Sequence, residues 1–516
     1  MRRCLIVLLG AVLAFTADGD VKITILAGAG GNIRAGSLSP VQVILENDET
    51  DRDGRVTAVY RMPYAPSMVS ATRSVPLPPH STKRVFLYLP TPEGYANPDR
   101  ILVRYETRGG NKIAELEERV ITSGGDLPIV CALGTAPPGL PALRQGEKDQ
   151  YKLLMLQPEQ IPDRPEGLEM YDALIVAPAP FAPLDRAQVL AIRDWVLRGG
   201  TLIVDVSARA DSLRDEVFAL MLPLAPVGTQ QAALQVFQRE VPFASGNVAF
   251  GKALFESDGH PLAVRGSYGL GSVTCFAIDP SAAFFVEWPG REALWNELFS
   301  GLRLGQEPAD DDYRRYTGFG YVANEVYQGL AELVTNAPST PLRLGLVLFL
   351  TAIYALAVGP GDFFFVRRIR RPKLTWLTFP GMVAAFTIGA YIGAKEWVGG
   401  ELSTLNVQRV VCFPQPELTI YYDLTSLFAP EGNDYEVRDT NEGFLRHVSA
   451  EYDMSQRLRM NGDDLSIVQR IPIWTRRIYG ASRTVPGPGP VDLTLKKEND
   501  VLMATIANHS EWTLHD

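Results

Sequence analysis

Residues 359–373 read GPGDFFFVRRIRRPK, and this stretch decides how the chain is organised. Its last seven residues carry five positive charges and no negative one, although the whole chain has a formal net charge of −10. The five are Arg367, Arg368, Arg370, Arg371 and Lys373. Moving one Lys or Arg to the centre of a bilayer costs about 2.5–3.5 kcal/mol. We therefore expect this short basic segment to stay in water.

Long apolar runs flank the basic segment on both sides. Residues 341–366 and 374–395 are each long enough, at about 1.5 Å of rise per residue, to cross a hydrocarbon layer of roughly 30 Å. Short basic loops favour the cytoplasmic side. The pattern predicts two transmembrane helices joined by a cytoplasmic loop at 367–373. The alternative is a buried helical hairpin in a soluble core.

Asp362 is the acidic residue of the first apolar segment. An intramembrane carboxylate is a functional candidate, so a proton or ion relay is one interpretation. Asp362 lies close to the expected cytoplasmic headgroups, however, where Arg367 is available as a partner. We favour a structural role, in which Pro360 and Gly361 bend the end of the helix.

The N-terminus is typical of an export signal. Arg2 and Arg3 precede a short apolar run, which predicts a signal peptide over residues 1–19, with a retained signal anchor as the alternative. A cleaved signal and two crossings leave both large portions of the chain outside. The predicted location is the cytoplasmic (inner) membrane, with two passes and the lipid bilayer as a partner.

The exported portions read as several domains. A length of 516 residues suggests about three domains, and the acidic balance argues against a nucleic-acid partner. Residues 20–125 alternate apolar and polar positions between turn signals, which predicts a β-sandwich. Residues 400–516 return to the same pattern and predict a β-rich extracytoplasmic domain. Residues 306–340 read as a polar linker followed by an amphipathic helix.

Residues 126–305 have a different pattern. Compact apolar runs (LPIVCALG, YDALIVAP, GTLIVDVS and GSVTCFAID) are typical of buried strands. Residues 184–200 place Val189, Ile192 and Val196 on one helical stripe, with Asp185 suited to the N-cap. The pattern predicts a parallel α/β domain with helices on both faces of its sheet. The fold class is thus multidomain α/β plus β.

Cysteine and histidine offer little chemistry. Cys131 and Cys275 lie inside predicted core strands, where we expect buried free thiols, with a disulfide as the alternative. Cys412 is unpaired in either case. The five histidines form no metal motif, so no metal or cofactor is expected.

Three residues are weak catalytic candidates. Asp205 and Ser207 follow a buried strand, where α/β sheets place their sites, and His260 is the histidine of this region. The segment VDVSARAD lacks the Gly-x-Ser-x-Gly elbow that a serine nucleophile needs.

Several segments together resemble a known architecture. YDALIVAPAPF, WVLRGG, TLIVDVS and GSYGLGSVTCFAIDP resemble class I glutamine amidotransferase-like domains of bacterial membrane proteins, whose folds are flavodoxin-like. GGNIRAGSLSPVQVILEN and the hairpin VGPGDFFFVRRIRRPK are similar to the sandwich and paired crossing of one such uncharacterised family. True amidotransferases use a cysteine in a Gly-x-Cys-x-Gly elbow, which this sequence lacks. The resemblance implies a catalytically incomplete domain, and membership of a membrane complex driven by a cytoplasmic ATPase.

The leading hypothesis is a non-enzymatic envelope protein whose exported domains bind a protein partner or ligand, with other envelope proteins as the expected partners. A hydrolase or amidotransferase-like enzyme outside the cytoplasm, using Asp205, Ser207 or His260, is the second hypothesis. An accessory subunit of a transporter is the third. The oligomeric state does not follow from the sequence.

Overall fold

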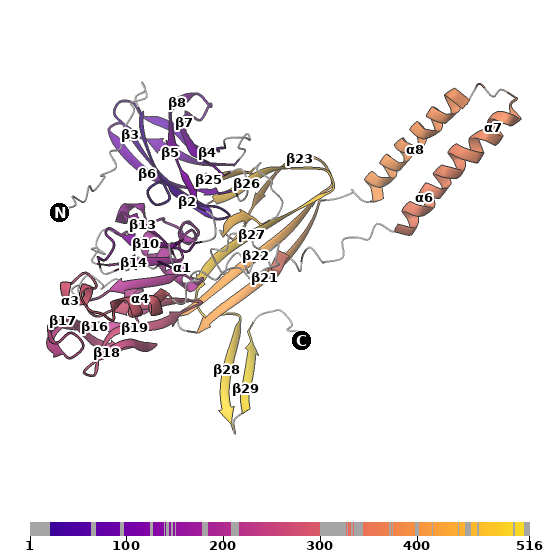
Figure 1. Cartoon of the computed structure of the whole chain (residues 1–516). Helices are drawn as coiled ribbons and strands as arrows, with labels where there is room; N and C mark the ends of the chain where they lie inside the picture. Colours follow the sequence, from indigo (N-terminus) through magenta and orange to yellow (C-terminus); the bar gives the residue numbers. More distant parts are fainter. Residues whose placement is uncertain are drawn as a thin grey trace.

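The structure is a computed structural model, and it describes most of the chain outside the N-terminal segment and the region around residues 300–343. The described residues are 21–62, 69–92, 97–123, 127–138, 140, 144–145, 148–149, 151–177, 184–207, 216–299, 327, 329–331, 334, 344–370, 373, 375–397, 402–414, 416–441, 443–448, 456–461, 464–498 and 501–509. The predicted signal peptide and most of the predicted linker lie outside them. The fold is multidomain and mostly β, with two long apolar helices (Figure 1).

The N-terminal portion forms one layer of a sandwich from a three-stranded antiparallel sheet in the order β1-β3-β6. The strands are β1 (Val21–Ala27), β3 (Leu38–Asn47) and β6 (Ser81–Pro90). Alternate residues of β1 are buried, as the period-two pattern predicts. A short parallel pair, β2 (Asn32–Arg34) with β9 (Ile121–Ser123), lies beside it.

The second layer combines strands from the two ends of the chain. Its seven-stranded order is β23-β26-β25-β5-β4-β7-β8. From the N-terminal portion come β4 (Arg52–Arg61), β5 (Ser70–Leu77), β7 (Arg100–Thr107) and β8 (Lys112–Arg119). From beyond the apolar helices come β23 (Asn433–Arg438), β25 (Gln456–Asn461) and β26 (Asp464–Ile471).

The junction of this sheet is a parallel pairing of β25 with β5, in which Leu458 lies opposite Ala71. Leu458 and Met460 are 3% and 2% exposed and belong to the same hydrophobic core as Val43 of β3. The segments 20–125 and 400–516, expected to form a β-sandwich and a β-rich domain, thus contribute strands to one sheet. The sequence patterns identified strands but contained no information about which distant strands pair.

The central portion is a mixed seven-stranded sheet in the order β13-β10-β14-β15-β20-β19-β18. The first five strands run parallel to one another, and β19 and β18 complete the sheet in antiparallel fashion. The strands are β13 (Lys152–Leu156), β10 (Ile129–Leu133), β14 (Ala173–Val176), β15 (Thr201–Asp205), β20 (Gly271–Phe276), β19 (His260–Tyr268) and β18 (Lys252–Ser257).

Helices cover both faces of this central sheet. α1 (Arg186–Leu197) and α2 (Glu216–Met221) contribute to one core, and α3 (Ala283–Val286) and α4 (Arg291–Phe299) to the other. Asp185 is the N-cap of α1, and its carboxylate accepts a hydrogen bond from the Gln188 backbone N–H at 2.9 Å. A hairpin of β16 (Leu224–Leu234) and β17 (Arg239–Val248), which the sequence analysis did not predict, precedes β18.

The rest of the C-terminal portion is an antiparallel sheet in the order β21-β22-β27-β24, followed by a separate hairpin. The strands are β21 (Ser403–Pro414), β22 (Glu417–Ala429), β24 (Phe444–His447) and β27 (Thr475–Pro486), then β28 (Val491–Glu498) and β29 (Val501–Asn508). The remaining short elements are β11 (Arg144–Gln145), β12 (Lys148–Asp149), η1 (Pro158–Gln160) and η2 (Pro165–Leu168).

Two helices are long and apolar enough to span a membrane, over Leu348–Arg368 and Thr375–Gly393. The first consists of α6 (Leu344–Leu356), the π-helical turn η4 (Ala357–Gly361) and α7 (Asp362–Arg368), and the second is α8 (Thr375–Trp397). The π-helical turn contains Pro360, so the helix passes through this residue with a wider turn. Only 11% of the first span and none of the second is buried, unlike a hairpin in a soluble core.

Candidate functional site

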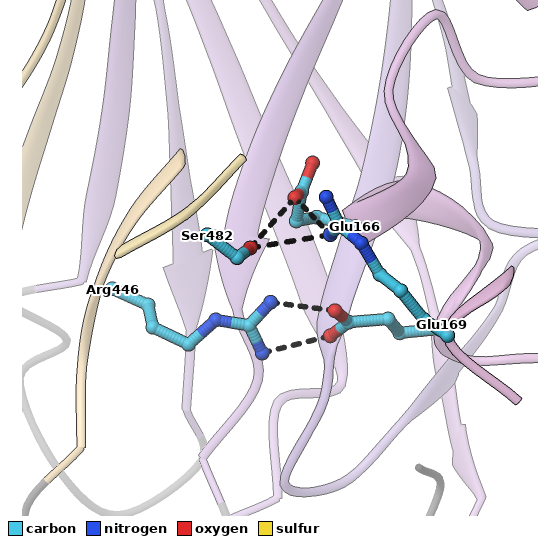
Figure 2. A network of polar contacts seen from close by, with 5 residues as sticks. Glu166, Glu169, Arg446 and Ser482 are labelled. Carbon is cyan, nitrogen blue, oxygen red and sulfur yellow. Dashed lines mark hydrogen bonds and ion pairs between the residues drawn. The ribbon is translucent and has the colours of Figure 1, made fainter. Parts of the chain in front are cut away.

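A buried network of ion pairs lies where the central portion meets the C-terminal sheet (Figure 2). Glu166 belongs to the 3-10 helix η2, Glu169 caps the end of that helix, and Arg198 caps the end of α1. Arg446 comes from β24 and Ser482 from the neighbouring strand β27. The network therefore joins residues that precede the apolar helices to residues that follow them.

Two ion pairs form the network. Arg198 Nη1 donates to Glu166 Oε1 at 2.6 Å and to Ser482 Oγ at 3.2 Å, and Ser482 Oγ also donates to Glu166 Oε1. Arg446 forms a bidentate pair with Glu169, at 2.8 and 2.5 Å (Figure 2). Two parallel hydrogen bonds fix the orientation of the Arg446 side chain relative to Glu169 as well as their separation, because the guanidinium and the carboxylate must be coplanar.

The charges of the network are nearly excluded from solvent. The side chains of Arg198 and Glu166 are 4% and 3% exposed. Burial alone would raise the pKa of Glu166, but the Arg198 guanidinium outweighs it and holds that pKa below its ordinary value. Burial would likewise lower the pKa of Arg446, which the Glu169 carboxylate instead raises. Glu166 and Arg446 are therefore charged at neutral pH, and each needs its partner to remain buried.

Tyr327 packs against the network. Its ring lies 5.4 Å below the Arg446 guanidinium and makes an edge contact with Tyr422 of β22. Tyr327 and Val334 are fully buried, and Arg476 donates to the Val334 carbonyl oxygen at 3.4 Å. Tyr327 and Val334 are thus packed onto the C-terminal sheet.

A second polar junction joins the N-terminal portion to the central sheet. Arg34 of β2, which is 2% exposed, pairs with Asp172 at 2.8 Å, and the same carboxylate oxygen accepts from the Ile129 N–H. Lys152 of β13 donates to Asn32 Oδ1 at 2.6 Å. Burial lowers the pKa of Lys152. The N-terminal, central and C-terminal portions are therefore linked by specific polar contacts.

The three catalytic candidates do not form one constellation. Asp205 ends β15, and its carboxylate accepts the Ser207 N–H at 2.8 Å, which makes a local turn. His260 begins β19, two strands away in the sheet, and its ring packs 4.8 Å from Phe243. With strands about 4.8 Å apart, the two sites are separated by about 10 Å sideways alone. Ser207 Oγ is buried and has no hydrogen-bond partner within the described residues.

Cys131, Cys275 and Cys412, the cysteines of the described residues, are free thiols. Cys131 on β10 and Cys275 on β20 are separated by two intervening strands, which is too far for a disulfide. Burial raises the pKa of the Cys275 thiol to about 12 and also raises that of Cys131. A nucleophilic thiol needs the opposite environment. The described part of the chain also contains no group of three or more metal-ligating side chains.

Asp362 is 3% exposed, between the π-helical turn and α7, and its Oδ1 has no hydrogen-bond partner in the described residues. Arg367 lies over the ring of Phe363, and no ion pair joins it to Asp362. Of the basic turn, Arg367, Arg368, Arg370 and Lys373 are described, whereas Arg371 lies outside the described residues.

The sequence analysis missed Glu166, Glu169, Arg198 and Arg446. A weak signal existed, because Glu169 and Arg446 each stand within an apolar stretch, in GLEMYDAL and GFLRHV. Charged residues are rarely buried unless paired. Nothing local indicated the partner of either residue.

Comparisons with known proteins describe only part of this architecture. Residues 20–120 match a family described as Domain of unknown function (DUF8726). No curated protein matches the chain. Among solved structures, an exo-β-1,4-mannosidase from Opitutaceae bacterium strain TAV5 is similar over 35% of this chain and 37% of its own, at 15% identity and a TM-score of 0.24.

Two further structures are similar at the same low level. The sporulation control protein Spo0M from Bacillus subtilis matches 20% of this chain and 50% of its own, with 11% identity and a TM-score of 0.15. A Paenibacillus cycloisomaltooligosaccharide glucanotransferase matches 90% of this chain and 69% of its own, with 10% identity and a TM-score of 0.21. The chain spans 37% of the length of the mannosidase and 50% of the length of Spo0M. TM-scores this low carry no argument about function.

Proposed function

We propose that this chain is a non-enzymatic envelope protein, anchored in the cytoplasmic membrane by a helical hairpin. Its exported portions form one interlocked body that binds a partner protein or ligand. The observation that carries the proposal is the pairing of β5 with β25, which lie on opposite sides of the hairpin in the sequence. Two strands of one sheet must lie in the same compartment. The chain between them therefore crosses the membrane an even number of times.

The charge of the turn supports the orientation. Arg367 and Arg368 end the first span, and Arg370 and Lys373 follow in the turn before the second, where burial in hydrocarbon would be costly. The exposed apolar surface of the helices, with Trp376 at 89% and Leu377 at 72%, supports lipid as their environment. The interlocked body would then lie outside the cytoplasm and the basic turn inside.

The central sheet supports a binding role over a catalytic one. We infer that it is a flavodoxin-like domain related to the glutamine amidotransferase class, extended by the antiparallel strands β19 and β18. Its buried cysteines lie within strands, where burial raises the pKa of the thiols. The Asp205 turn and His260 lie two strands apart. These features favour a domain that binds a partner at its surface and does not catalyse a covalent reaction.

Cysteine labelling tests the orientation. In a chain carrying Cys412→Ser, we compare Arg370→Cys in the basic turn with Val227→Cys on β16, where the native valine is 80% exposed. A membrane-impermeant maleimide added to spheroplasts should label Val227→Cys at once, and Arg370→Cys only after the membrane is broken. Labelling of Arg370→Cys in intact spheroplasts would overturn the orientation.

Cleavage tests the interlocked body separately. A protease site placed between residues 310 and 311 divides the chain before the hairpin. After cleavage in mild detergent, the two fragments should co-purify, and they should separate only in denaturant. Fragments that separate in native buffer would exclude one interlocked body, whatever the orientation.

A further inference from the structure

The last two strands form a hairpin that pairs with no other strand of the described chain. β28 and β29 pair over eight residues each, from Val491 opposite Asn508 to Glu498 opposite Val501. Figure 1 shows this hairpin projecting from the end of the C-terminal sheet. Met503 and Ile506, on opposite faces of β29, are 51% and 60% exposed, so neither face is covered. A two-stranded hairpin alone is only marginally stable in water.

The C-terminal sheet has an open edge close to the base of this hairpin. β21 is a twelve-residue strand whose strand neighbour in the described chain is β22. On its other side, no strand of the described residues pairs with its backbone N–H and C=O groups. Proteins usually protect such edges with charges, bulges or short strands. The run Ser403–Pro414 carries a single charge, at Arg409, and pairs with β22 without a bulge.

The connection between sheet and hairpin lies at the end of that open edge. Residues 486–490 read PGPGP. A Cβ added to Gly489 would lie 2.1 Å from the Cys412 Sγ and 3.3 Å from the Thr419 Oγ1, so the backbone there crosses the face of β21 and its partner β22 near the end of β21. The Gly487 N–H donates to the Glu417 carbonyl oxygen at 2.9 Å, and this glycine has a φ of 116°. The hairpin thus leaves the sheet beside an unpaired edge and extends away from it.

We propose that the β28–β29 hairpin is an exchanged arm, which adds to the open edge of β21 in a second copy of this chain. An eight-residue strand fits within a twelve-residue edge, and the addition would satisfy backbone groups that both elements leave unpaired. Reciprocal exchange gives a closed two-fold dimer, in which each copy supplies one arm and one edge.

The hinge favours a second copy over the chain's own edge. Reaching its own β21 would require the hairpin to reverse direction within residues 487–490. Pro488 and Pro490 restrict that reversal, because each proline holds φ near −65° and lacks an N–H for a tight turn. Short constrained hinges are known to favour exchange between copies.

Cross-linking between differently marked copies tests the proposal. In a Cys412→Ser background, one full-length chain carries Asn406→Cys on β21 and another carries Thr505→Cys on β29, and both are expressed in the same membrane. Both native side chains are exposed, and Cys131 and Cys275 are fully buried. A short bismaleimide should join the two chains into a heterodimer. Pairing Val227→Cys with Thr505→Cys is the matched control and should give little product.

Three results would overturn the proposal. The first is a chain carrying both cysteines that cross-links only within itself, since the arm would then close on its own edge. The second is capture of Thr505→Cys by a different protein in place of the Asn406→Cys chain. The third comes from deleting residues 491–508, which should reduce the particle in mild detergent from two chains to one; a dimer that persists would contradict the exchange.

Discussion

Arg446 and Glu169 are separated by 277 residues and by both apolar helices, yet their side chains form a bidentate ion pair at 2.5 and 2.8 Å. The pair is nearly buried, with 14% and 7% of the two side chains exposed. A charge in such a place is tolerated only with its partner. This contact therefore shows that the portions of the chain before and after the apolar helices fold against each other.

Replacing Arg446 tests how strongly that contact holds the halves together. Arg446→Met leaves the Glu169 carboxylate buried without a counter-charge, and we expect a loss of about 3–5 kcal/mol in the free energy of unfolding. The measurement is urea unfolding of the full chain in mild detergent. Arg55→Met is the matched control, because its pair with Glu106 leaves Arg55 46% exposed, and such pairs contribute about 0–1 kcal/mol. Equal effects of the two changes would contradict the assigned role.

The Glu166 carboxylate should make the protein acid-sensitive. Its pKa lies below the ordinary value of 4.5 in the folded state. Its stabilising effect is therefore complete above pH 4.5 and is lost as the pH falls through the lowered pKa. Glu166→Gln should be less stable at neutral pH and should lose less stability on acidification. Glu106→Gln, at a surface pair, should keep the wild-type acid dependence, and the same dependence in Glu166→Gln would refute the assignment.

The buried cysteines should react only when the protein unfolds. In the Cys412→Ser chain at pH 8, the thiols of Cys131 and Cys275 are protonated and shielded, because burial raises the pKa of both. A chromogenic disulfide reagent should report no fast reaction until urea reaches the unfolding midpoint. A cysteine at position 227, where the native valine is 80% exposed, should react immediately. Fast reaction of Cys131 in the folded chain would contradict this prediction and would favour a role for Cys131 as a nucleophile.

Leu458 tests the sheet junction. Its side chain is 3% exposed in the core that β25 shares with the N-terminal strands. Leu458→Ala should cost about 2–5 kcal/mol of stability, as for other large-to-small changes in cores. It should also weaken the association of the fragments produced by cleavage between residues 310 and 311. Ile473→Ala is the control, because this side chain is 47% exposed. It should change neither the stability nor the association of the fragments.

Local features of the sequence predicted much of the secondary structure. The apolar lengths predicted both long helices, and the stripe of Val189, Ile192 and Val196 predicted the buried face of α1. The alternation of apolar and polar residues predicted β1, and compact runs rich in β-branched residues predicted β10 and β15. These signals succeed because helical and strand periods are properties of neighbouring residues.

The pairing of distant elements could not be predicted in the same way. No local pattern in the segment around Arg457 indicates that it lies parallel to Ser70, since register depends on which faces meet in the folded core. The same holds for the Glu169–Arg446 pair. Each residue alone resembles a surface charge, and only the fold reveals that it is buried.

The placement of β25 next to β5 has a consequence for biogenesis. During synthesis, one side of β5 has no strand neighbour until the ribosome has made both long apolar helices and the chain as far as β25. The N-terminal portion must therefore be kept from self-association during this interval. A holding chaperone would protect this edge until β25 pairs with it.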